Sequence, residues 1–159
     1  MSYAYYPGCS LHSTAEEYDR SFRQVCSGLG IEIEEVRNWI CCGSSPAHGT
    51  SHLLSIALPA HNLSIVEKSG KEEVVVPCAA CFSRFKFAAH ETANHPKMKA
   101  DVAEAIGSTP PEDVNTTHPL EIFANMDEKK TASAVKKPMP GFRVACYYGC
   151  LLTRPPKVM

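Results

Sequence analysis

Short strand-like stretches alternate with longer segments of helical periodicity through the first two thirds of the chain. Three stretches are short and rich in aromatic, alternating or β-branched residues, as strands are: residues 3–9, 31–36 and 71–77. Apolar residues recur at helical spacing in the segments that follow: residues 14–29, 52–66, 78–94 and 97–107. Strand followed by helix, three times over, predicts an α/β domain. We expect a Rossmann-like parallel sheet with helices on both faces.

Two local features bear on the boundaries of these helices. Ser13 or Thr14 is expected to cap the first long helix, because Glu16 and Glu17 would then lie in its first turn. Pro59 lies inside the second helical segment. We expect a kink or a break there, since proline lacks a backbone N–H and clashes with the preceding turn.

Cysteines follow each predicted strand and precede each predicted helix. They are Cys9 after the first strand, Cys41 and Cys42 after the second, and Cys78 and Cys81 after the third. The carboxyl ends of parallel strands share one edge of the sheet, where open α/β sheets build their sites. We therefore expect five sulfurs that are distant in sequence to meet at that edge.

The arrangement of these cysteines favours a metal over disulfide bonds. Adjacent cysteines are poorly placed for a disulfide, because bridged residues prefer Cα atoms about 5.5 Å apart. Gly43 lets the backbone turn sharply after the adjacent pair, and Cys78 and Cys81 begin a helix whose free N–H groups favour thiolates. Five thiolates exceed the four ligands of structural zinc, whereas an iron–sulfur cluster can use more. Zinc held by four of the five stays an alternative.

The composition of the chain disfavours several classes of function. The formal net charge is −1 and no basic stripe is present, which disfavours nucleic-acid and membrane-surface binding. No apolar run approaches the ~20 residues of a membrane span, and the N-terminal residues lack the pattern of a signal peptide. A total of 8 cysteines is typical of metal binding or catalysis in the reducing cytosol. We therefore expect a cytoplasmic protein.

The other cysteines and the histidines have plainer interpretations. Cys26 follows Phe22 by one helical turn on an apolar face and is expected in the core. Cys146 is expected in the core or at an edge. His48 and His52 are spaced for chelation on a helix, but a solvated or capping role is favoured. His48 also lies close enough to the cysteine pair for an indirect role.

The character of the chain changes after the last predicted helix. Residues 1–107 are predicted to form one domain. Residues 108–140 are rich in proline, threonine and lysine, and we expect a linker or crossover with a short helix at residues 119–126.

A weak internal repeat follows this linker. The sequence "ACYYGCLL" around Cys150 resembles "AYYPGCSL" around Cys9, with aromatic residues and glycine before the cysteine and leucine two residues after it. Residues 141–159 are therefore predicted to be the start of a truncated second domain that opens with a strand. On this interpretation the chain is the front part of a longer protein.

Taken together, these motifs resemble the CCG cysteine-rich domain found in the B subunit of heterodisulfide reductases. Related domains occur in subunits of thiol-linked fumarate reductase, glycolate oxidase and lactate-utilisation systems. The order of the motif is Cys9, 31 residues, Cys41-Cys42, 35 residues that begin with Gly43, and Cys78-x-x-Cys81. The stretches "YYPGCS", "VPCAACF", "HPLE" and "YYGCLLTRPP" are most similar to the heterodisulfide reductase protein, and the resemblance covers the full length of the chain.

The resemblance implies a cofactor and its ligands. Such proteins usually carry two CCG domains, each with a non-cubane four-iron four-sulfur (4Fe-4S) cluster on five cysteines. The implied cluster ligands are Cys9, Cys41, Cys42, Cys78 and Cys81, with Gly43 shaping the turn. Cys150 matches the first ligand of a second motif, whose Cys-Cys-Gly and Cys-x-x-Cys partners are not in this chain.

The same resemblance implies an activity and partners. The relatives are thought to split the disulfide between coenzyme M and coenzyme B with electrons from partner iron–sulfur and flavin subunits. We therefore expect an oxidoreductase subunit that acts on a disulfide of this kind, with the present chain inactive on its own. Two alternatives stay open: a non-catalytic electron-relay module of an oxidase or dehydrogenase complex, and a zinc-stabilised structural domain.

Overall fold

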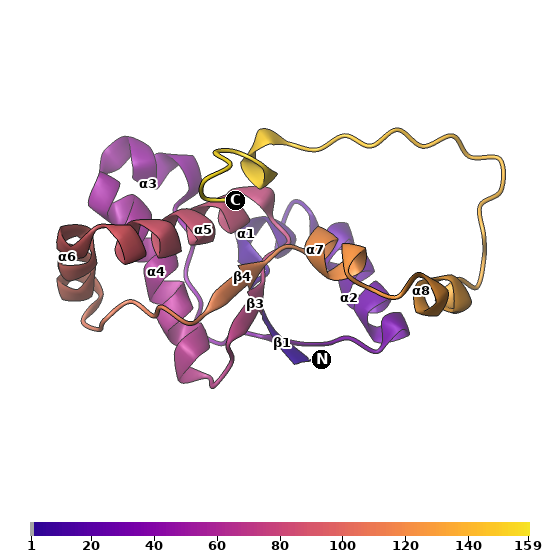
Figure 1. The fold of residues 1–159 in the computed structure, drawn as a ribbon, viewed down its shortest axis with the longest axis horizontal. Coiled ribbons are helices and arrows are strands. Elements are labelled where there is room, and N and C mark those ends of the chain that lie inside the picture. Colours follow the sequence, from indigo (N-terminus) through magenta and orange to yellow (C-terminus); the bar gives the residue numbers. More distant parts are fainter. Residues whose placement is uncertain (1) are drawn as a thin grey trace.

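The fold is a parallel sheet between two layers of helices. The computed structural model describes residues 2–159. The sheet consists of β1 (Ser2–Tyr5), β2 (Glu32–Glu35), β3 (Glu73–Val75) and β4 (Asn115–Thr117). All pairs are parallel and the spatial order is β2-β1-β3-β4, so β1 and β3 are the inner strands (Figure 1). The predicted α/β class with a parallel sheet is confirmed.

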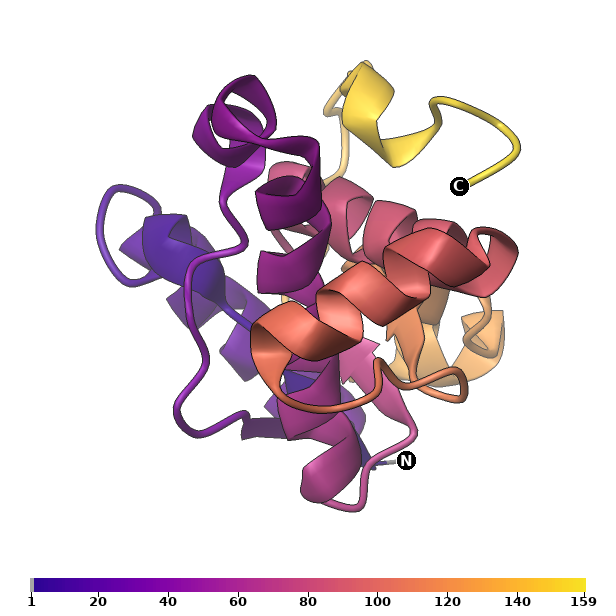
Figure 2. The same cartoon turned by 90° about the vertical axis from the view of Figure 1, so that its left-hand side faces the viewer.

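Helices cover both faces of this sheet. The helical elements in the described part of the chain are α1 (Gly8–Leu11), α2 (Glu16–Leu29), α3 (Ser44–Thr50), α4 (His52–Lys68), α5 (Ala79–Asn94), α6 (Pro96–Ile106), α7 (Pro119–Ala124), α8 (Glu128–Ala134) and a 3₁₀ turn at Cys150–Leu152. Helices α4, α5 and α6 pack together on one face, and Figure 2 looks onto this layer. Helices α2 and α7 lie on the other face (Figure 1).

Alternation along β1 explains why this strand is buried on both sides. Ala4 and Tyr6 join the core cluster that contains residues of α4 and α5. Tyr3 and Tyr5 point the other way and join the cluster around Phe22 of α2. The valines of β3 divide between the same two clusters. A strand with apolar side chains on both faces belongs in the middle of a parallel sheet, which is where β1 and β3 lie.

The start of α2 differs from the predicted one. The helix begins at Glu16 after Ala15, which makes no side-chain cap, so neither Ser13 nor Thr14 is the capping residue. The Ser13 hydroxyl instead donates to the backbone carbonyl of Cys9, at 2.8 Å. Ser13 does not cap α2 because the chain forms the short helix α1 directly after β1, and the hydroxyl of Ser13 bonds back to that helix.

The break expected at Pro59 does not occur. Helix α4 runs continuously from His52 to Lys68 with Pro59 inside it. Residues around most of its circumference are buried, since α4 packs against α3, α5 and α6 as well as the sheet. Burial on several sides outweighs the local cost of the proline, which is about 3 kcal/mol in an exposed helix.

The region predicted as a linker contributes a fourth strand. Residues 115–117 form β4 beside β3, and their pairing places Thr117 opposite Val75. The short helix expected at residues 119–126 is confirmed as α7. A triplet of polar residues has no apolar signature, and pairing with β3 rather than side-chain pattern makes it a strand.

The last segment of the chain takes no part in the sheet. The strand expected after residue 141 is absent from the described part of the chain, where residues 142–149 have no regular structure. The segment arcs away from the body in Figure 1, and the 3₁₀ turn at Cys150–Leu152 then packs on α5. An isolated stretch without neighbouring strands cannot satisfy its backbone as a strand. A second domain beginning here stays a prediction.

None of the helices between residues 2 and 159 combines the length and the apolar character needed to cross a membrane.

His118, at the end of β4, is a buried link between two elements. Its Nε2 lies 3.0 Å from the carbonyl oxygen of Pro77, while Nδ1 accepts from the backbone N–H of Leu120 at 3.3 Å. Nε2 therefore carries the proton and donates to Pro77. Burial lowers the pKa of His118 below its ordinary value of 6.5.

This lowered pKa predicts an acid-sensitive contribution to stability. The unfolded chain takes up a proton near pH 6.5 that the folded chain resists, so the contribution is present above that pH and is lost as the pH falls below it. His118→Asn keeps a capping acceptor for α7 but cannot titrate. Urea unfolding of the metal-free protein at pH 7.5 and 5.5 should show a smaller loss of stability in the variant. Equal losses in both proteins would contradict the prediction.

Candidate metal centre

The fold brings the predicted cysteines to the carboxyl edge of the sheet. Cys9 lies in α1 after β1, and Cys41 and Cys42 lie in the loop between β2 and α3. Cys78 is the residue before α5 and Cys81 lies in its first turn. All are free thiols. The edge predicted from the strand–helix pattern is therefore the edge at which the cysteines lie.

Tyr6 packs among these cysteines. This residue is fully buried just after β1, in the core cluster that contains Cys42 and Cys81. Its hydroxyl donates to the carbonyl of Ile40, the residue before Cys41, at 2.7 Å. Burial raises the pKa of its phenol, and ionisation of the neighbouring thiols would raise it further.

Three of the thiols form what we call the buried group, in which Cys42 and Cys81 are buried and Cys78 is half-buried. The Sγ atoms of Cys42 and Cys81 lie 3.2 Å apart and share a hydrogen bond. A hydrogen bond with Cys81 lowers the pKa of Cys78 to about 6, helped by the backbone N–H groups of Cys81 and Ala80 at the start of α5. The same thiol lowers the pKa of Cys42 to about 7, helped by the N–H of Ser44. The pKa of Cys81 itself is raised by its hydrogen bonds to both neighbours and by burial.

Two further thiols form an exposed group beside the first. Cys9 and Cys41 are solvent-exposed, and Cys9 is among the groups that raise the pKa of Cys41. The N–H of Gly43 donates to the Cys41 sulfur at 3.4 Å and lowers the pKa of that thiol, but burial and the neighbouring cysteines outweigh it, so the pKa is raised. The adjacent cysteines are thus divided, because Cys42 joins the buried group and Cys41 joins the exposed one.

Two glycines make this division possible. Gly43 has φ +79°, and a Cβ there would lie 2.5 Å from the Cβ of Ala47 and 2.7 Å from Cδ1 of Leu58. Gly8 has φ +71°, and a Cβ there would lie 3.1 Å from the sulfur of Cys81. Both positions need a left-handed backbone and an open side. Gly43 thereby has the turning role predicted for it.

The donor set fits a cluster better than a single ion. The edge of the sheet offers five thiols, one more than the four ligands of a structural zinc ion. Soft thiol ligands in two adjacent groups, two of them with lowered pKa values, suit a larger body with several irons. The residues present therefore fit an iron–sulfur cluster.

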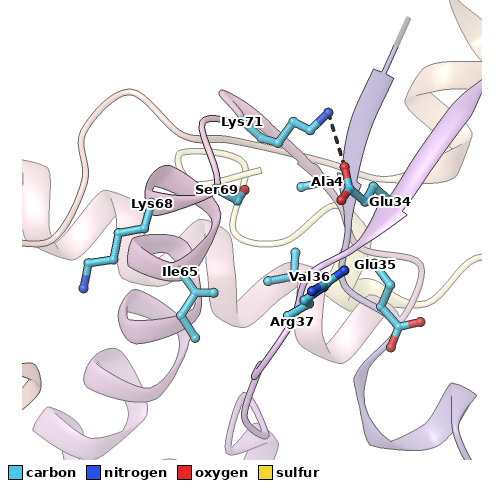
Figure 3. A pocket seen from close by; sticks show the side chains of 9 residues that line it. All are labelled: Ala4, Glu34, Glu35, Val36, Arg37, Ile65, Lys68, Ser69 and Lys71. Atoms are coloured by element: carbon cyan, nitrogen blue, oxygen red, sulfur yellow. Dashed lines mark ion pairs between the residues drawn. The ribbon is translucent and has the colours of Figure 1, made fainter.

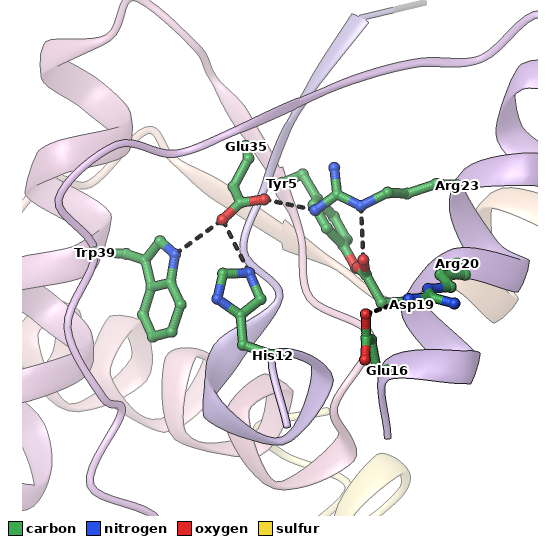
Figure 4. Close-up of polar contacts among 8 residues, drawn as sticks. All are labelled: Tyr5, His12, Glu16, Asp19, Arg20, Arg23, Glu35 and Trp39. Carbon is green, nitrogen blue, oxygen red and sulfur yellow. Dashed lines mark hydrogen bonds and ion pairs between the residues drawn. The ribbon is translucent and has the colours of Figure 1, made fainter. Parts of the chain in front are cut away.

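A polar network supports the exposed side of the centre (Figure 4). The carboxylate of Glu35, at the end of β2, accepts hydrogen bonds from the indole N–H of Trp39 at 3.3 Å and from Arg23 at 2.5 Å. Nε2 of His12 lies 3.1 Å from the same carboxylate. Arg23 also pairs with Asp19 at 2.8 Å. Glu35 thereby ties the helix that carries Cys9 to the loop that leads to Cys41.

Other residues singled out in the sequence lie elsewhere. Cys26 is fully buried in the core, as predicted, and burial raises its pKa. Cys146 is exposed rather than in the core, because the segment around it forms no strand. His48 and His52 are exposed with ring centroids 6.3 Å apart, in keeping with a solvated role. Cys150 is also exposed.

A separate pocket of about 240 Å³ lies between β2 and the end of α4 (Figure 3). Its charged residues include Lys71 and Glu34, whose Nζ and Oε2 atoms lie 3.8 Å apart as an ion pair. Its described lining contains no cysteine, so this pocket is not part of the candidate metal centre.

The polar side chains that hold the cysteine loops are not evident from the sequence patterns. Asn62 is fully buried on α4 and its amide hydrogen-bonds to the backbone of Ile40, next to Cys41. His118 bonds in the same way to Pro77, next to Cys78. The sequence does offer one signal for Asn62, which is a single asparagine in an apolar helical segment. Burying its amide there would cost free energy unless the amide had hydrogen-bond partners.

Comparison with known proteins gives a family match and several relatives. The CCG cysteine-rich domain matches residues 3–86, which include all five motif cysteines. The chain is 32% identical over 157 residues to the 8-methylmenaquinol:fumarate reductase membrane anchor subunit of Wolinella succinogenes, covering 98% of this chain and 54% of that protein. It is 24% identical over 166 residues to a heterodisulfide reductase B-subunit-like protein of Archaeoglobus profundus, covering 99% of this chain and 54% of that protein.

A third relative is matched over a shorter stretch. An uncharacterized iron-sulfur protein of Methanococcus maripaludis is 30% identical over 86 residues, covering 54% of this chain and 17% of that protein. The chain thus spans about half the length of the two relatives that it matches throughout.

The crowding at Gly43 predicts that alanine at this position destabilises the protein, whereas alanine at an uncrowded glycine does not. Gly43→Ala should lower the free energy of unfolding by about 1–3 kcal/mol, because it adds overpacking to a strained φ. Gly28→Ala is the matched control, since a Cβ on Gly28 of α2 meets no atom within 4 Å. That substitution should be neutral or stabilise by up to about 1 kcal/mol. Urea unfolding measures both, and unchanged stability of Gly43→Ala would refute the account of the turn.

The lowered pKa of Cys78 predicts unusual reactivity at mildly acidic pH. In metal-free protein, alkylation of Cys78 by iodoacetamide should reach half its maximal rate near pH 6, because its pKa is about 6. Cys26, buried and with a raised pKa, should stay unmodified. Cys81→Ala should move the midpoint for Cys78 upward, since Cys81 is the largest cause of the shift. A midpoint that does not move in this variant would overturn the assignment of that cause.

Proposed function

The chain belongs to the family of CCG cysteine-rich domains, and from this premise we propose that it binds one iron–sulfur cluster as part of a redox subunit. The proposed ligands are Cys9, Cys41, Cys42, Cys78 and Cys81. The single observation that carries the proposal is the meeting of a buried and an exposed group of thiols at one sheet edge. The family and the relatives support an iron–sulfur redox subunit.

The protein's own residues prepare the site for binding. Cys42 and Cys78 have lowered pKa values and are available as thiolates near neutral pH. Cys81, whose pKa is raised by its hydrogen bonds to the two neighbours, would have to lose its proton to serve as a ligand. Tyr6 and Phe82, both buried, limit the access of water from the core side. When bound, the cluster supplies one-electron transfer at this edge.

The proposed cluster type is a non-cubane 4Fe-4S cluster. A conventional four-iron cluster takes four cysteine ligands. The edge offers five thiols, and the adjacent pair divides its sulfurs between the buried and the exposed group. A fifth cysteine ligand favours a distorted arrangement of irons over a symmetrical cube. The division of Cys41 and Cys42 between the two groups of thiols favours it as well.

The proposed reaction is reduction of a disulfide within a reductase complex. The cleavage consumes two electrons and two protons and leaves two thiols, as for a disulfide between coenzyme M and coenzyme B. Partner iron–sulfur and flavin subunits would supply the electrons. Support comes from the similarity over 99% of this chain to a protein named for its likeness to the B subunit of heterodisulfide reductase.

An electron-relay role is the second candidate. The observation in its favour is the higher identity, 32% against 24%, to a subunit of a fumarate reductase. In that case the chain would pass electrons between partners without touching a disulfide. Because all eight thiols are free, we propose a reducing compartment, the cytoplasm, for either role.

Metal analysis tests the cluster and its ligands. Anaerobically prepared protein should contain about four irons and four sulfides per chain, with an EPR signal in one redox state. Cys41→Ser and Cys42→Ser should each lose at least about half of the iron, since each removes one of five ligands. Cys26→Ser is the matched control and should keep all of it, because Cys26 lies in the core. Full iron content in both motif variants, or zinc without sulfide in the wild type, would refute the proposal.

A further inference from the structure

We propose that Asn62 is a positioning residue that sets the geometry of the Cys41–Cys42 pair through the peptide of Ile40. The inference rests on the proposed function, since it concerns how the same ligands are held. The hydrogen bonds of Asn62 go to backbone groups of Ile40 and Leu58 rather than to a sulfur. Its effect is transmitted through the backbone that leads into the pair.

The amide of Asn62 holds both polar groups of one residue. Its Oδ1 accepts from the backbone N–H of Ile40 at 2.9 Å, and its Nδ2 donates to the carbonyl of Ile40 at 3.0 Å. Nδ2 also donates to the carbonyl of Leu58 within α4, at 3.2 Å, which fixes the plane of the amide. The side chain thus pairs with Ile40 as a neighbouring strand would.

The peptide of Ile40 has few other anchors of its own, although the neighbouring Trp39 bonds to Glu35 and packs on the core. Residues 39–43 have no regular structure, and the side chain of Ile40 is 37% exposed, so apolar packing does not anchor it. One further contact is the hydroxyl of Tyr6, which donates to the same Ile40 carbonyl at 2.7 Å. Two buried side chains from α4 and the end of β1 therefore determine where the Ile40 peptide lies.

The position of this peptide decides where the two sulfurs point. Directly after Ile40 the chain places Cys41 outward and Cys42 inward, 3.2 Å from Cys81, and then turns at Gly43. A rotation of the Ile40 peptide would move both sulfurs together, because they follow it without an intervening residue. Asparagine is also a weak helix former compared with leucine, so its place in the buried interior of α4 has no explanation from helix stability.

The first test measures the loop without metal. Asn62→Leu removes the amide while keeping a similar volume. Hydrogen exchange in the metal-free protein should become about tenfold faster or more at the amides of residues 40–43, because Ile40 N–H loses its acceptor and the loop its anchor. Amides of α5 should be unchanged. Tyr6→Phe, which leaves the Asn62 contacts in place, should show a smaller effect at the same residues and serves if Asn62→Leu does not fold.

Two control variants on the same helix separate positioning from general stability. Ser64→Ala removes a buried hydroxyl that bonds only within α4, to the carbonyl of Ala60. Ile56→Ala creates a cavity in the separate core cluster between α4, α5 and α6 and should lower the melting temperature at least as much as Asn62→Leu. Neither control should selectively accelerate exchange at residues 40–43.

The second test uses the iron content and EPR signal of the bound cluster to report the geometry of the Cys41–Cys42 pair. After anaerobic reconstitution, Asn62→Leu should retain less iron than the wild type, and its EPR signal should be shifted or broadened. The signals of Ser64→Ala and Ile56→Ala should match the wild type. Unchanged exchange at residues 40–43 in Asn62→Leu would overturn the inference, and so would an unchanged EPR signal in the loaded variant. If the wild type binds no cluster, the proposed function fails, and exchange in the metal-free protein still decides the role of Asn62.

Discussion

The whole site depends on the pairing of β1 with a strand on each side. Tyr5 is opposite Glu35 of β2 and also opposite Val75 of β3, so the three strands end at nearly the same level. Each strand then releases a loop with cysteines at its carboxyl end. The pairing is maintained by side chains of β1 that alternate between two core clusters. Residues far apart in sequence therefore become neighbours without any covalent bond between them.

Thiols that lie close together at one edge of the sheet repel one another when they ionise, and the structure relieves this repulsion in part. Three thiols in the buried group cannot all ionise together, and Cys81 keeps its proton while Cys42 and Cys78 approach the thiolate form. The start of α5 contributes N–H groups to Cys78, which offsets part of its burial. A cationic body that binds the thiolates would remove the remaining repulsion. Such binding would therefore be coupled to the loss of a proton.

The sequence allowed the class of fold and the edge of the site to be predicted, because both follow from strong local patterns. The β-branched run before Cys78 and the alternation before Cys41 identify strands, and parallel strands place their ends together. Strand β4 escaped prediction because three polar residues become a strand only by pairing with β3. The sequence also does not predict that the side chain of Cys42 points inward and that of Cys41 outward. These directions depend on Gly43, and Asn62 contacts the loop across a separation in sequence that periodicity does not report.

The buried polar contacts suggest how the two helix layers share control of the site. The peptide before the adjacent cysteines is held by Asn62 of α4, in one layer. The peptide before Cys78 is held by His118, where β4 leads into α7 in the other layer. A buried amide or imidazole is costly when unpaired, so each of these contacts tolerates little displacement. Movement of either layer against the sheet would therefore shift one set of sulfurs relative to the other. The spacing between the thiols is thus a property of the packed domain as a whole.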